Sequence, residues 1–173
     1  MKEISIQELE INPYTIFSKD WMALTAGDES LGFNTMTISW GHIGSIWDSN
    51  SRSNLPTIIS YVRPSRYTKE FMDSQEYFSL SQFPEEYHKA LGYLGSHSGR
   101  DSDKVSEVGL TPVFSDNTTY FAQADLVFIC RKIYTQEIKE EGFVEKDMVN
   151  RVYPKKDFHT MYVGEIVKIL MDE

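Results

Sequence analysis

The sequence predicts a mainly β protein, an antiparallel barrel that is closed or partly open and carries a few inserted helices. Three observations lead to this prediction. Short segments rich in β-branched and aromatic residues recur along the chain, turn-forming residues separate them, and two or three segments change to a helical period. Because the turn residues are spread evenly and no linker or repeat occurs, we expect residues 1–173 to form a single domain.

The first predicted strands are residues 18–26 and 36–43, which the turn residues between them join into a hairpin. Residues 49–54 are polar and are expected to form a loop. A third strand is expected over residues 56–64, where β-branched and aromatic residues lie between two prolines.

Helical spacing then appears in three places. Residues 65–74 are predicted to form a short amphipathic helix, because two aromatic residues lie four positions apart with charges between them. Residues 77–82 return to a strand. Residues 84–99 are predicted to be helical, with apolar residues on one face and glycines near the end, and residues 98–109 to form a loop and a short helix.

Strands return from Pro112 onward. The run over residues 124–135 is long and apolar enough to lie at the centre of a sheet, and it holds the single cysteine, Cys130, as an expected core residue. The last strand is predicted over residues 161–171. Gly164 in it indicates a bulge or a close backbone approach.

Composition restricts the possible functions. A net charge of −9 argues against nucleic-acid binding, which needs many cations, so any anionic ligand must be met by a few local cations. No apolar run approaches the roughly 20 residues that cross a bilayer. The acidic start has no secretory pattern, so we expect no membrane contact and a cytoplasmic location. One cysteine and four histidines without metal-binding spacing predict no metal site.

The stretch NTMTISWG, residues 34–41, alternates between two faces. Thr35, Thr37 and Ser39 lie on one face and form a row of hydroxyl groups, whereas Met36 and Trp40 lie on the other. Small hydroxyl side chains allow a flat ligand to approach the backbone and can donate to its oxygen atoms. The alternative is a half-buried strand in which threonine serves β propensity alone.

Two groups of basic residues are candidate anion clamps. Arg63 and Arg66 end the third predicted strand, and Arg100 and Lys104 follow Gly99, where a tight turn can expose backbone amides. The alternative for the second group is a solvated loop in which neighbouring aspartates pair with the two cations.

No hydrolase, kinase or dinucleotide-binding motif is present, and we identify no catalytic residue. Two histidines, His97 and His159, are candidates for a ligand pocket, although an isolated histidine is more often structural. Trp40 is the best aromatic candidate for stacking on a planar heterocycle, because it follows the hydroxyl row.

Three motifs in order, NTMTISWG, PTIISYVRPSRYT and SGRDSDKV followed by GLTP, resemble the flavin reductase-like family of FMN-binding split β-barrel proteins. The similarity runs from residue 34 to residue 112, with a weaker match in FHTMYVGEIV. It implies a Greek-key split barrel and a homodimer, with FMN near the subunit interface.

The resemblance also implies roles for individual residues. It places Asn34, Met36, Thr37 and Trp40 along the flavin, and His159 on the nicotinamide side of the pocket. The phosphate and ribityl chain would be met by residues of the two basic motifs, namely Arg63, Ser65, Thr68, Arg100 and Lys104.

The implied function is an NAD(P)H-dependent flavin reductase that moves a hydride from NADH or NADPH to the flavin, chemistry that belongs to the cofactors and needs no catalytic acid or base from the protein. A non-enzymatic, flavoredoxin-like FMN electron carrier between protein partners is the alternative. A third possibility is a split barrel that has lost its flavin and serves as a dimeric binding module.

Overall fold

The computed structural model describes residues 1–48 and 54–172. Its elements in chain order are β1 (Lys2–Ile4), η1 (Ile6–Glu8), α1 (Thr15–Ser18), β2 (Met22–Asp28), β3 (Gly32–Ile38), β4 (Gly41–Asp48), β5 (Asn54–Val62), α2 (Thr68–Ser74), β6 (Tyr77–Gln82), η2 (Glu85–Tyr87), α3 (His88–Ser96), α4 (Lys104–Glu107), β7 (Pro112–Ser115), β8 (Thr118–Phe121), β9 (Leu126–Glu137), η3 (Glu140–Gly142), α5 (Lys146–Val152) and β10 (Thr160–Met171). Among the described residues, no helix is long and apolar enough to cross a membrane.

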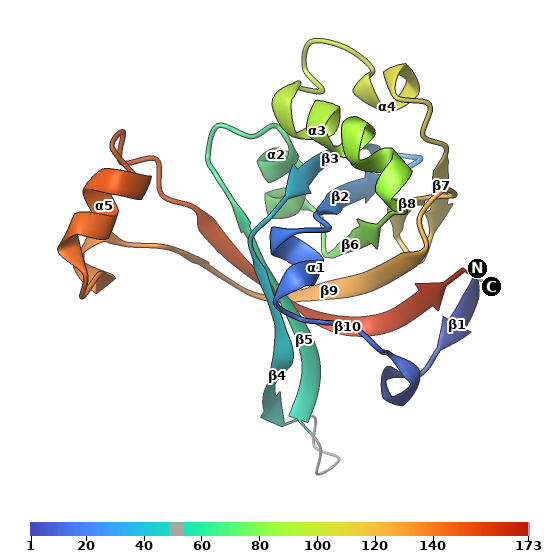
Figure 1. Cartoon of the computed structure of the whole chain (residues 1–173), viewed down its shortest axis with the longest axis horizontal. Helices are drawn as coiled ribbons and strands as arrows, with labels where there is room; N and C mark the ends of the chain where they lie inside the picture. The colour runs from blue at the N-terminus through green and yellow to red at the C-terminus, as the bar shows by residue number, and fades with distance from the viewer. Residues whose placement is uncertain (49–53, 173) are drawn as a thin grey trace.

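The main sheet has the strand order β3-β2-β6-β9-β10-β5-β4, with β1 paired to β10, and its pairings are antiparallel. Its curled form is visible in Figure 1. One face encloses an apolar core that includes Met22, Leu24, Phe78, Phe128 and Tyr162, all almost completely buried. The strands at the two ends of this order, β3 and β4, follow one another in the sequence.

A second apolar cluster covers the other face of β2. It contains Ala23, Leu91, Leu94, Val105 and Phe121, which come from β2, α3, α4 and β8. Figure 1 shows α3 and α4 lying over β2 and β3. Thr37 of the hydroxyl row contacts this cover through Leu91 of α3 and Thr35 is fully buried, whereas Ser39 is exposed.

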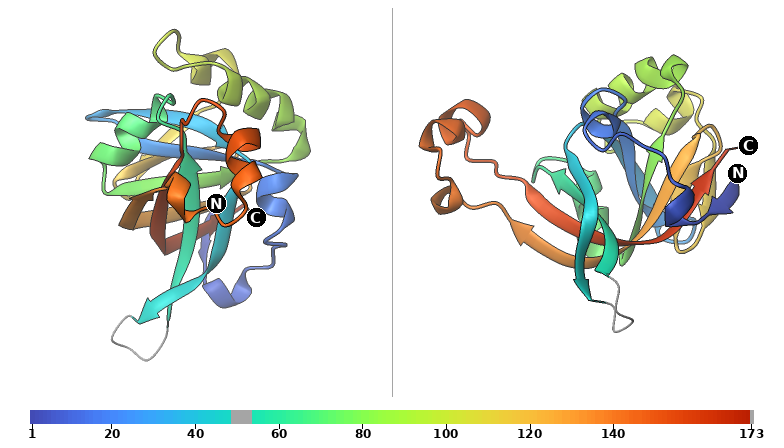
Figure 2. Two further views of the ribbon diagram at one scale, coloured as in Figure 1. Left: turned by 90° about the vertical axis from the view of Figure 1, so that its left-hand side faces the viewer. Right: turned by 60° about the horizontal axis from the view of Figure 1, so that its bottom comes forward.

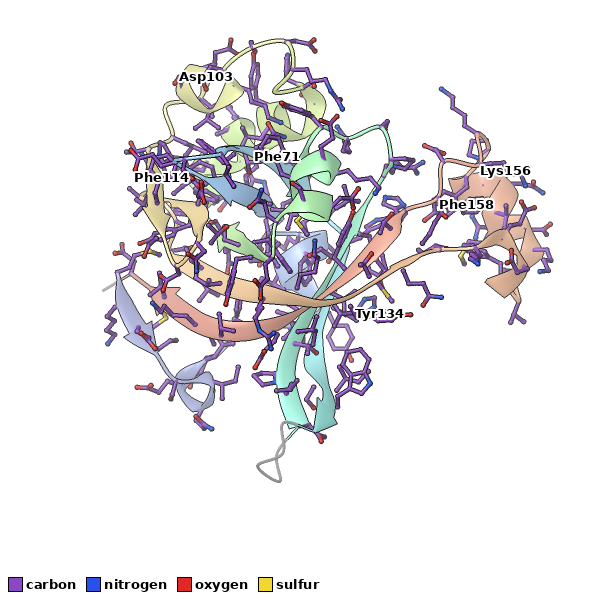
Figure 3. The ribbon with its side chains drawn as sticks, turned by 180° about the vertical axis from the view of Figure 1, so that it is seen from behind. Phe71, Asp103, Phe114, Tyr134, Lys156 and Phe158 are labelled. Carbon is purple, nitrogen blue, oxygen red and sulfur yellow. The ribbon has the colours of Figure 1, made fainter. Side chains whose placement is uncertain are left out.

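Two parts of the chain project from the barrel. The β9–β10 ribbon extends beyond it and carries η3 and α5, and we call residues 138–159 the arm (Figures 1 and 2). Lys156 and Phe158 lie on this arm (Figure 3). The β4–β5 hairpin is the second projection (Figure 1).

Most of the predicted elements are confirmed, with shifted ends. The hairpin forms as the β2–β3 pair, and β5, α2, β6, α3, α4, β9 and β10 all lie within a few residues of their predicted positions. Cys130 is fully buried. Gly164 combines a register shift with a close approach, since a Cβ there would lie 2.5 Å from the Phe78 ring.

Two predicted strands need correction. Residues 15–18 form α1 instead of the start of a strand, and β2 begins only at Met22. The predicted strand over residues 36–43 is two strands, because the chain leaves β2 at Ile38 and joins β5 from Gly41. A Cβ at Gly41 would lie 2.3 Å from the Phe17 ring, so the chain passes α1 closely at this change of partner.

The predicted loop over residues 49–54 falls outside the described residues except for Asn54, the first residue of β5. The α5 helix has no counterpart among the predicted elements. It belongs to the arm, which packs against little of the barrel and is held by the contacts described below.

Candidate functional site

The candidate site is a cavity of about 220 Å³ at the place where β3 ends and the chain turns into β4. Three segments far apart in the sequence meet there: the end of β3 with the two residues after it, the end of β5 with the loop after it, and the residue before β10. The lining residues are Met36, Thr37, Ile38, Ser39, Trp40, Tyr61, Arg63, Arg66 and His159. We call this space the Trp40–His159 cavity.

Two rings form one wall of the cavity. The centroids of Trp40 and His159 lie 4.8 Å apart with their planes tilted by 39°. The indole is 45% exposed, whereas the imidazole is only 8% exposed. The exposed indole provides a flat apolar surface at a position where a planar ligand can stack.

Two arginines also line the cavity. Arg66 donates from Nη1 to the Gly95 carbonyl at 2.7 Å, and Arg63 donates from Nη1 to Asp157 at 2.5 Å and from Nη2 to the Val152 carbonyl at 3.1 Å. A guanidinium carries five N–H donors, so each arginine keeps donors beyond these bonds. Both side chains line the cavity and make it attractive to an anion.

The imidazole of His159 is neutral at pH 7. Burial and the neighbouring Arg63 lower its pKa to about 4, with Arg66 acting in the same direction and Asp157 opposing. Its Nδ1 lies 2.8 Å from the Tyr153 hydroxyl. The ring therefore takes part as an uncharged hydrogen-bonding group.

The row of hydroxyl groups is only partly available to a ligand. Thr35 is fully buried and bonds to the Thr25 hydroxyl at 2.9 Å and the Leu24 carbonyl at 3.2 Å, so it does not reach the cavity. Thr37 lines the cavity, but its hydroxyl donates to the Leu91 carbonyl of α3 at 2.5 Å. Only Ser39, which is exposed, presents a hydroxyl without a partner among the described residues.

Three of the predicted site residues meet away from the Trp40–His159 cavity, and two of them, Asn34 and Gly99, line a separate cavity. The Asn34 amide donates to the Thr68 hydroxyl at 2.7 Å, and a Cβ at Gly99 would lie 2.0 Å from the Asn34 Oδ1. This contact joins β3, α2 and the loop after α3. Ser65 is exposed in the loop between β5 and α2 and makes no side-chain hydrogen bond to any described residue.

The second basic group does not face the Trp40–His159 cavity. The Lys104 side chain is 3% exposed, and its amine donates to the carbonyls of Leu94 and His97, both at 2.9 Å. These carbonyls belong to the end of α3, so Lys104 caps that helix. Burial and the nearby Arg66 lower the pKa of Lys104 to about 8.

Arg100 is likewise engaged. It forms an ion pair with Glu70, and its guanidinium lies 4.5 Å from the centre of the Tyr67 ring. The alternative pairing with neighbouring aspartates is not found, because Asp103 caps α4 and accepts from the Ser106 hydroxyl at 2.6 Å. Arg100 and Lys104 border a separate cavity of about 490 Å³.

The sequence did not identify every residue of the site. Tyr61 lines the cavity, and Arg66, although named as part of a basic pair, was not assigned to the flavin. Tyr153 and Asp157 contact His159 and Arg63. The sequence feature that could have identified Tyr153 and Asp157 is their position shortly before His159, in the segment YPKKDFH. No group of three or more metal-ligating side chains suitable for a metal occurs within residues 1–48 and 54–172.

The family model described as "Flavin reductase like domain" matches residues 18–173. The chain belongs to this family. A comparison with curated proteins gives no match.

Solved structures of flavin reductase-like proteins share the fold. The flavoredoxin of Desulfovibrio vulgaris (Miyazaki F) is 21% identical with a TM-score of 0.66, covering 100% of this chain and 78% of that one. An FMN-binding protein from Thermus thermophilus is 17% identical with a TM-score of 0.65, covering 100% and 83%. The NADH:FAD oxidoreductase of Streptomyces globisporus C-1027 is 16% identical with a TM-score of 0.61, covering 88% and 75%. The predicted split-barrel fold and the family resemblance are confirmed.

Proposed function

We propose that this flavin reductase-like protein binds FMN in the Trp40–His159 cavity and accepts a hydride onto it from NADH or NADPH. The observation that carries the proposal is the joining of two arginines and two aromatic rings in one cavity. FMN combines the corresponding parts, a dianionic phosphate and a flat heterocycle.

The side chains that line the cavity match the charge of FMN and offer a flat surface to its ring system. Arg63 and Arg66 would meet the phosphate, because guanidinium groups bind it with two parallel hydrogen bonds. Trp40 would lie against the ring system, and Ser39 and the backbone of residues 36–40 would donate to its oxygen atoms. A cavity of about 630 Å³ adjoins this one and shares Ser39, Trp40 and Tyr61 with it, which leaves room for a second substrate.

The protein's own residues would bind and orient the reactants. FMN, when bound, supplies the electron-accepting centre, so no acid–base pair is required of the chain. Trp40 and His159 would exclude water from one side of the ring, and hydroxyl or amide donors near residues 36–40 would stabilise negative charge that develops on it.

FMN titration of the purified protein tests the proposal. We expect a yellow complex whose absorption bleaches when NADH or NADPH is added without oxygen. Trp40→Ala should weaken FMN binding by about fivefold or more, because stacking on an aromatic ring contributes on the order of 1 kcal/mol or more. Protein that stays colourless in FMN and oxidises neither nicotinamide would overturn the proposal.

The second candidate is an FMN electron carrier between proteins. It is favoured by the similarity to two flavoredoxins and by the net charge of −9, which would attract a basic partner. Stopped-flow mixing separates the two functions. Rapid bleaching by either nicotinamide alone supports the reductase, whereas a yellow protein that reacts slowly with both supports the carrier.

We also propose that the protein is a homodimer. Ile46 and Trp47 on β4 and Tyr134 at the base of the arm are all exposed, and the Trp47 and Tyr134 rings lie 5.9 Å apart. Figure 3 labels Tyr134. An exposed group of large apolar side chains is typical of an interface. Light scattering should give twice the chain mass for the wild type and for the control Leu31→Glu, an exposed residue of the β2–β3 turn, but a monomer for Trp47→Glu.

A further inference from the structure

Tyr153 is a buried tyrosine that reaches the candidate site from the arm. It follows α5 directly, is 3% exposed, and lies in an aromatic cluster with Phe143 and Phe158, whose ring centroids are 6.0 and 4.7 Å from its own. It does not line the Trp40–His159 cavity. Its hydroxyl nevertheless lies 2.8 Å from His159, which does.

The hydrogen bonds around Tyr153 indicate which atom carries the proton. Burial raises the pKa of the Tyr153 hydroxyl, and the neighbouring Arg63 opposes the rise. Nδ1 of His159 is the one hydrogen-bond partner of this hydroxyl among the described residues, so the hydroxyl proton has no other acceptor there. If this hydroxyl donates to Nδ1 of His159, then in a neutral imidazole Nδ1 accepts and Nε2 carries the proton.

We propose that Tyr153 is a positioning residue that holds His159 as the Nε2–H tautomer, with this N–H directed into the cavity as a donor to an oxygen of the bound ligand. The ligand oxygen is of the carbonyl class, as in a flavin or a carboxamide. The inference rests on the proposed function for the identity of the ligand, but the state of the imidazole is independent of it.

The surroundings of His159 support a fixed ring. Trp40 lies against the imidazole, and Nε2 has no hydrogen-bond partner among the described residues although the side chain is nearly buried. The Nε2 atom is not completely shielded, unlike the buried polar atoms that lack a partner in the described residues. Because His159 lines the cavity, Nε2 is accessible from there. The donor is thus oriented and available.

Arg63 fixes the arm at the position that this role requires. Its guanidinium lies 5.2 Å from the centre of the Tyr153 ring, and it binds Asp157 and the Val152 carbonyl. Three residues of the arm therefore share one anchor at the end of β5. We infer that the arm contributes to the site through Tyr153 and is more than a projection from the barrel.

The tautomer of His159 can be measured by long-range proton–nitrogen NMR of the full-length protein at pH 7 without ligand. His159→Gln identifies the signals by their loss. We expect Nε2 to be the protonated nitrogen in the wild type. In Tyr153→Phe the ratio of the two tautomers should fall about fivefold, which corresponds to the loss of one hydrogen bond of about 1 kcal/mol.

The matched control is Tyr93→Phe, which removes a hydroxyl on α3 that donates to Glu107 and does not line the Trp40–His159 cavity. It should leave the His159 ratio unchanged. An unchanged ratio in Tyr153→Phe would overturn the inference. Protonation of Nδ1 in the wild type would overturn it even if Tyr153→Phe failed to fold.

FMN titration of the same variants separates the two proposals. We expect Tyr153→Phe to weaken FMN binding about threefold to tenfold in the wild type, and to have no further effect in a His159→Gln background, because residues that act through one another are not additive. Equal effects in both backgrounds would show that Tyr153 does not act through His159. Absence of FMN binding in the wild type would overturn the proposed function and leave the tautomer result standing.

Discussion

Two basic segments of this chain look alike in the sequence and differ in the structure. Residues 63–68, RPSRYT, place Arg63 and Arg66 against the Trp40–His159 cavity. Residues 98–104, SGRDSDK, use Lys104 to cap α3 and Arg100 to pair with Glu70. Both segments hold two cations near a turn and a helix start.

The difference lies in the acceptors that surround each cation. The carbonyls of Leu94 and His97 at the end of α3 accept two of the three N–H donors of the Lys104 amine, and the Lys104 side chain is buried. The arginines of the first segment have more donors than their protein acceptors use. A phosphate site therefore depends on accessible N–H donors that have no acceptor within the protein. The spacing of charged residues in the sequence does not show how many such donors remain.

The largest effect that can test this comparison is on stability. Lys104→Met should lower the free energy of unfolding by about 3 kcal/mol, because it leaves two carbonyls of α3 buried and without a donor. Urea unfolding at pH 7 measures this loss. The affinity of the folded variant for FMN should change less than threefold.

Lys89→Met is the matched control, since Lys89 is exposed on the same helix. It should change stability by less than about 0.5 kcal/mol. A Lys104→Met protein of wild-type stability with much weaker FMN binding would reverse the roles of the two segments.

Several parts of the fold were predictable because their patterns are local. The alternation and the bounding prolines predicted β5, and the four-residue spacing of Tyr67 and Phe71 predicted α2. The break at Ser39 and Trp40 was not predictable, because the strand pattern continues through it. It arises from a change of partner strand, which depends on long-range pairing.

The site was predictable to the level of segments and less well to the level of atoms. Residues 36–40, Arg63 and His159, which the resemblance places at the flavin or its phosphate, line one cavity, and their contact with a flavin stays a prediction. The sequence could not show that α3 covers Thr37, because the two faces of a strand are equivalent until the helix is placed. Tyr153 was missed because its role depends on how the arm folds back to Arg63.

The second prediction tests the first basic segment directly. Arg66→Met should weaken FMN binding tenfold to about 100-fold, since charge-assisted hydrogen bonds contribute roughly 1.5–3 kcal/mol. Riboflavin lacks the phosphate, so its affinity should change little. Titrations with both flavins measure the difference.

Arg100→Met provides the comparison from the other segment and should alter FMN affinity less than about twofold. A larger effect of Arg100→Met than of Arg66→Met would place the phosphate at residues 98–104. If Arg66→Met weakened FMN and riboflavin binding equally, Arg66 would have a structural role and would not bind the phosphate.

The third prediction uses His159 to report the charge of the first segment. Burial, Arg63 and Arg66 lower its pKa to about 4 in the folded protein, below its usual value of about 6.5. The unfolded chain therefore binds more protons between these pH values. The stability associated with neutral His159 is full above pH 6.5 and is lost as the pH falls toward 4, at about 1.4 kcal/mol per pH unit or less.

Urea unfolding between pH 7 and pH 4 measures this dependence. His159→Gln should remove part of the slope, and Arg66→Met should raise the pKa of His159 because it removes one of the cations that lower it. Arg100→Met should leave that pKa unchanged. A His159 that titrates near 6.5 in the folded wild type would contradict the burial and the cationic surroundings of the ring.

The smallest effect is expected where the second basic segment meets α2. Arg100 and Glu70 form an ion pair whose side chains are 45% and 61% exposed, and such pairs are well screened by solvent. A double-mutant cycle with Arg100→Met and Glu70→Gln should give a coupling of less than about 1 kcal/mol, and less in 1 M salt. A coupling that grows when FMN is added, and disappears with riboflavin, would mean that Arg100 responds to the phosphate after all. If FMN leaves the coupling unchanged, Arg100 stabilises its own loop, whereas Arg66 is the cation available to the ligand.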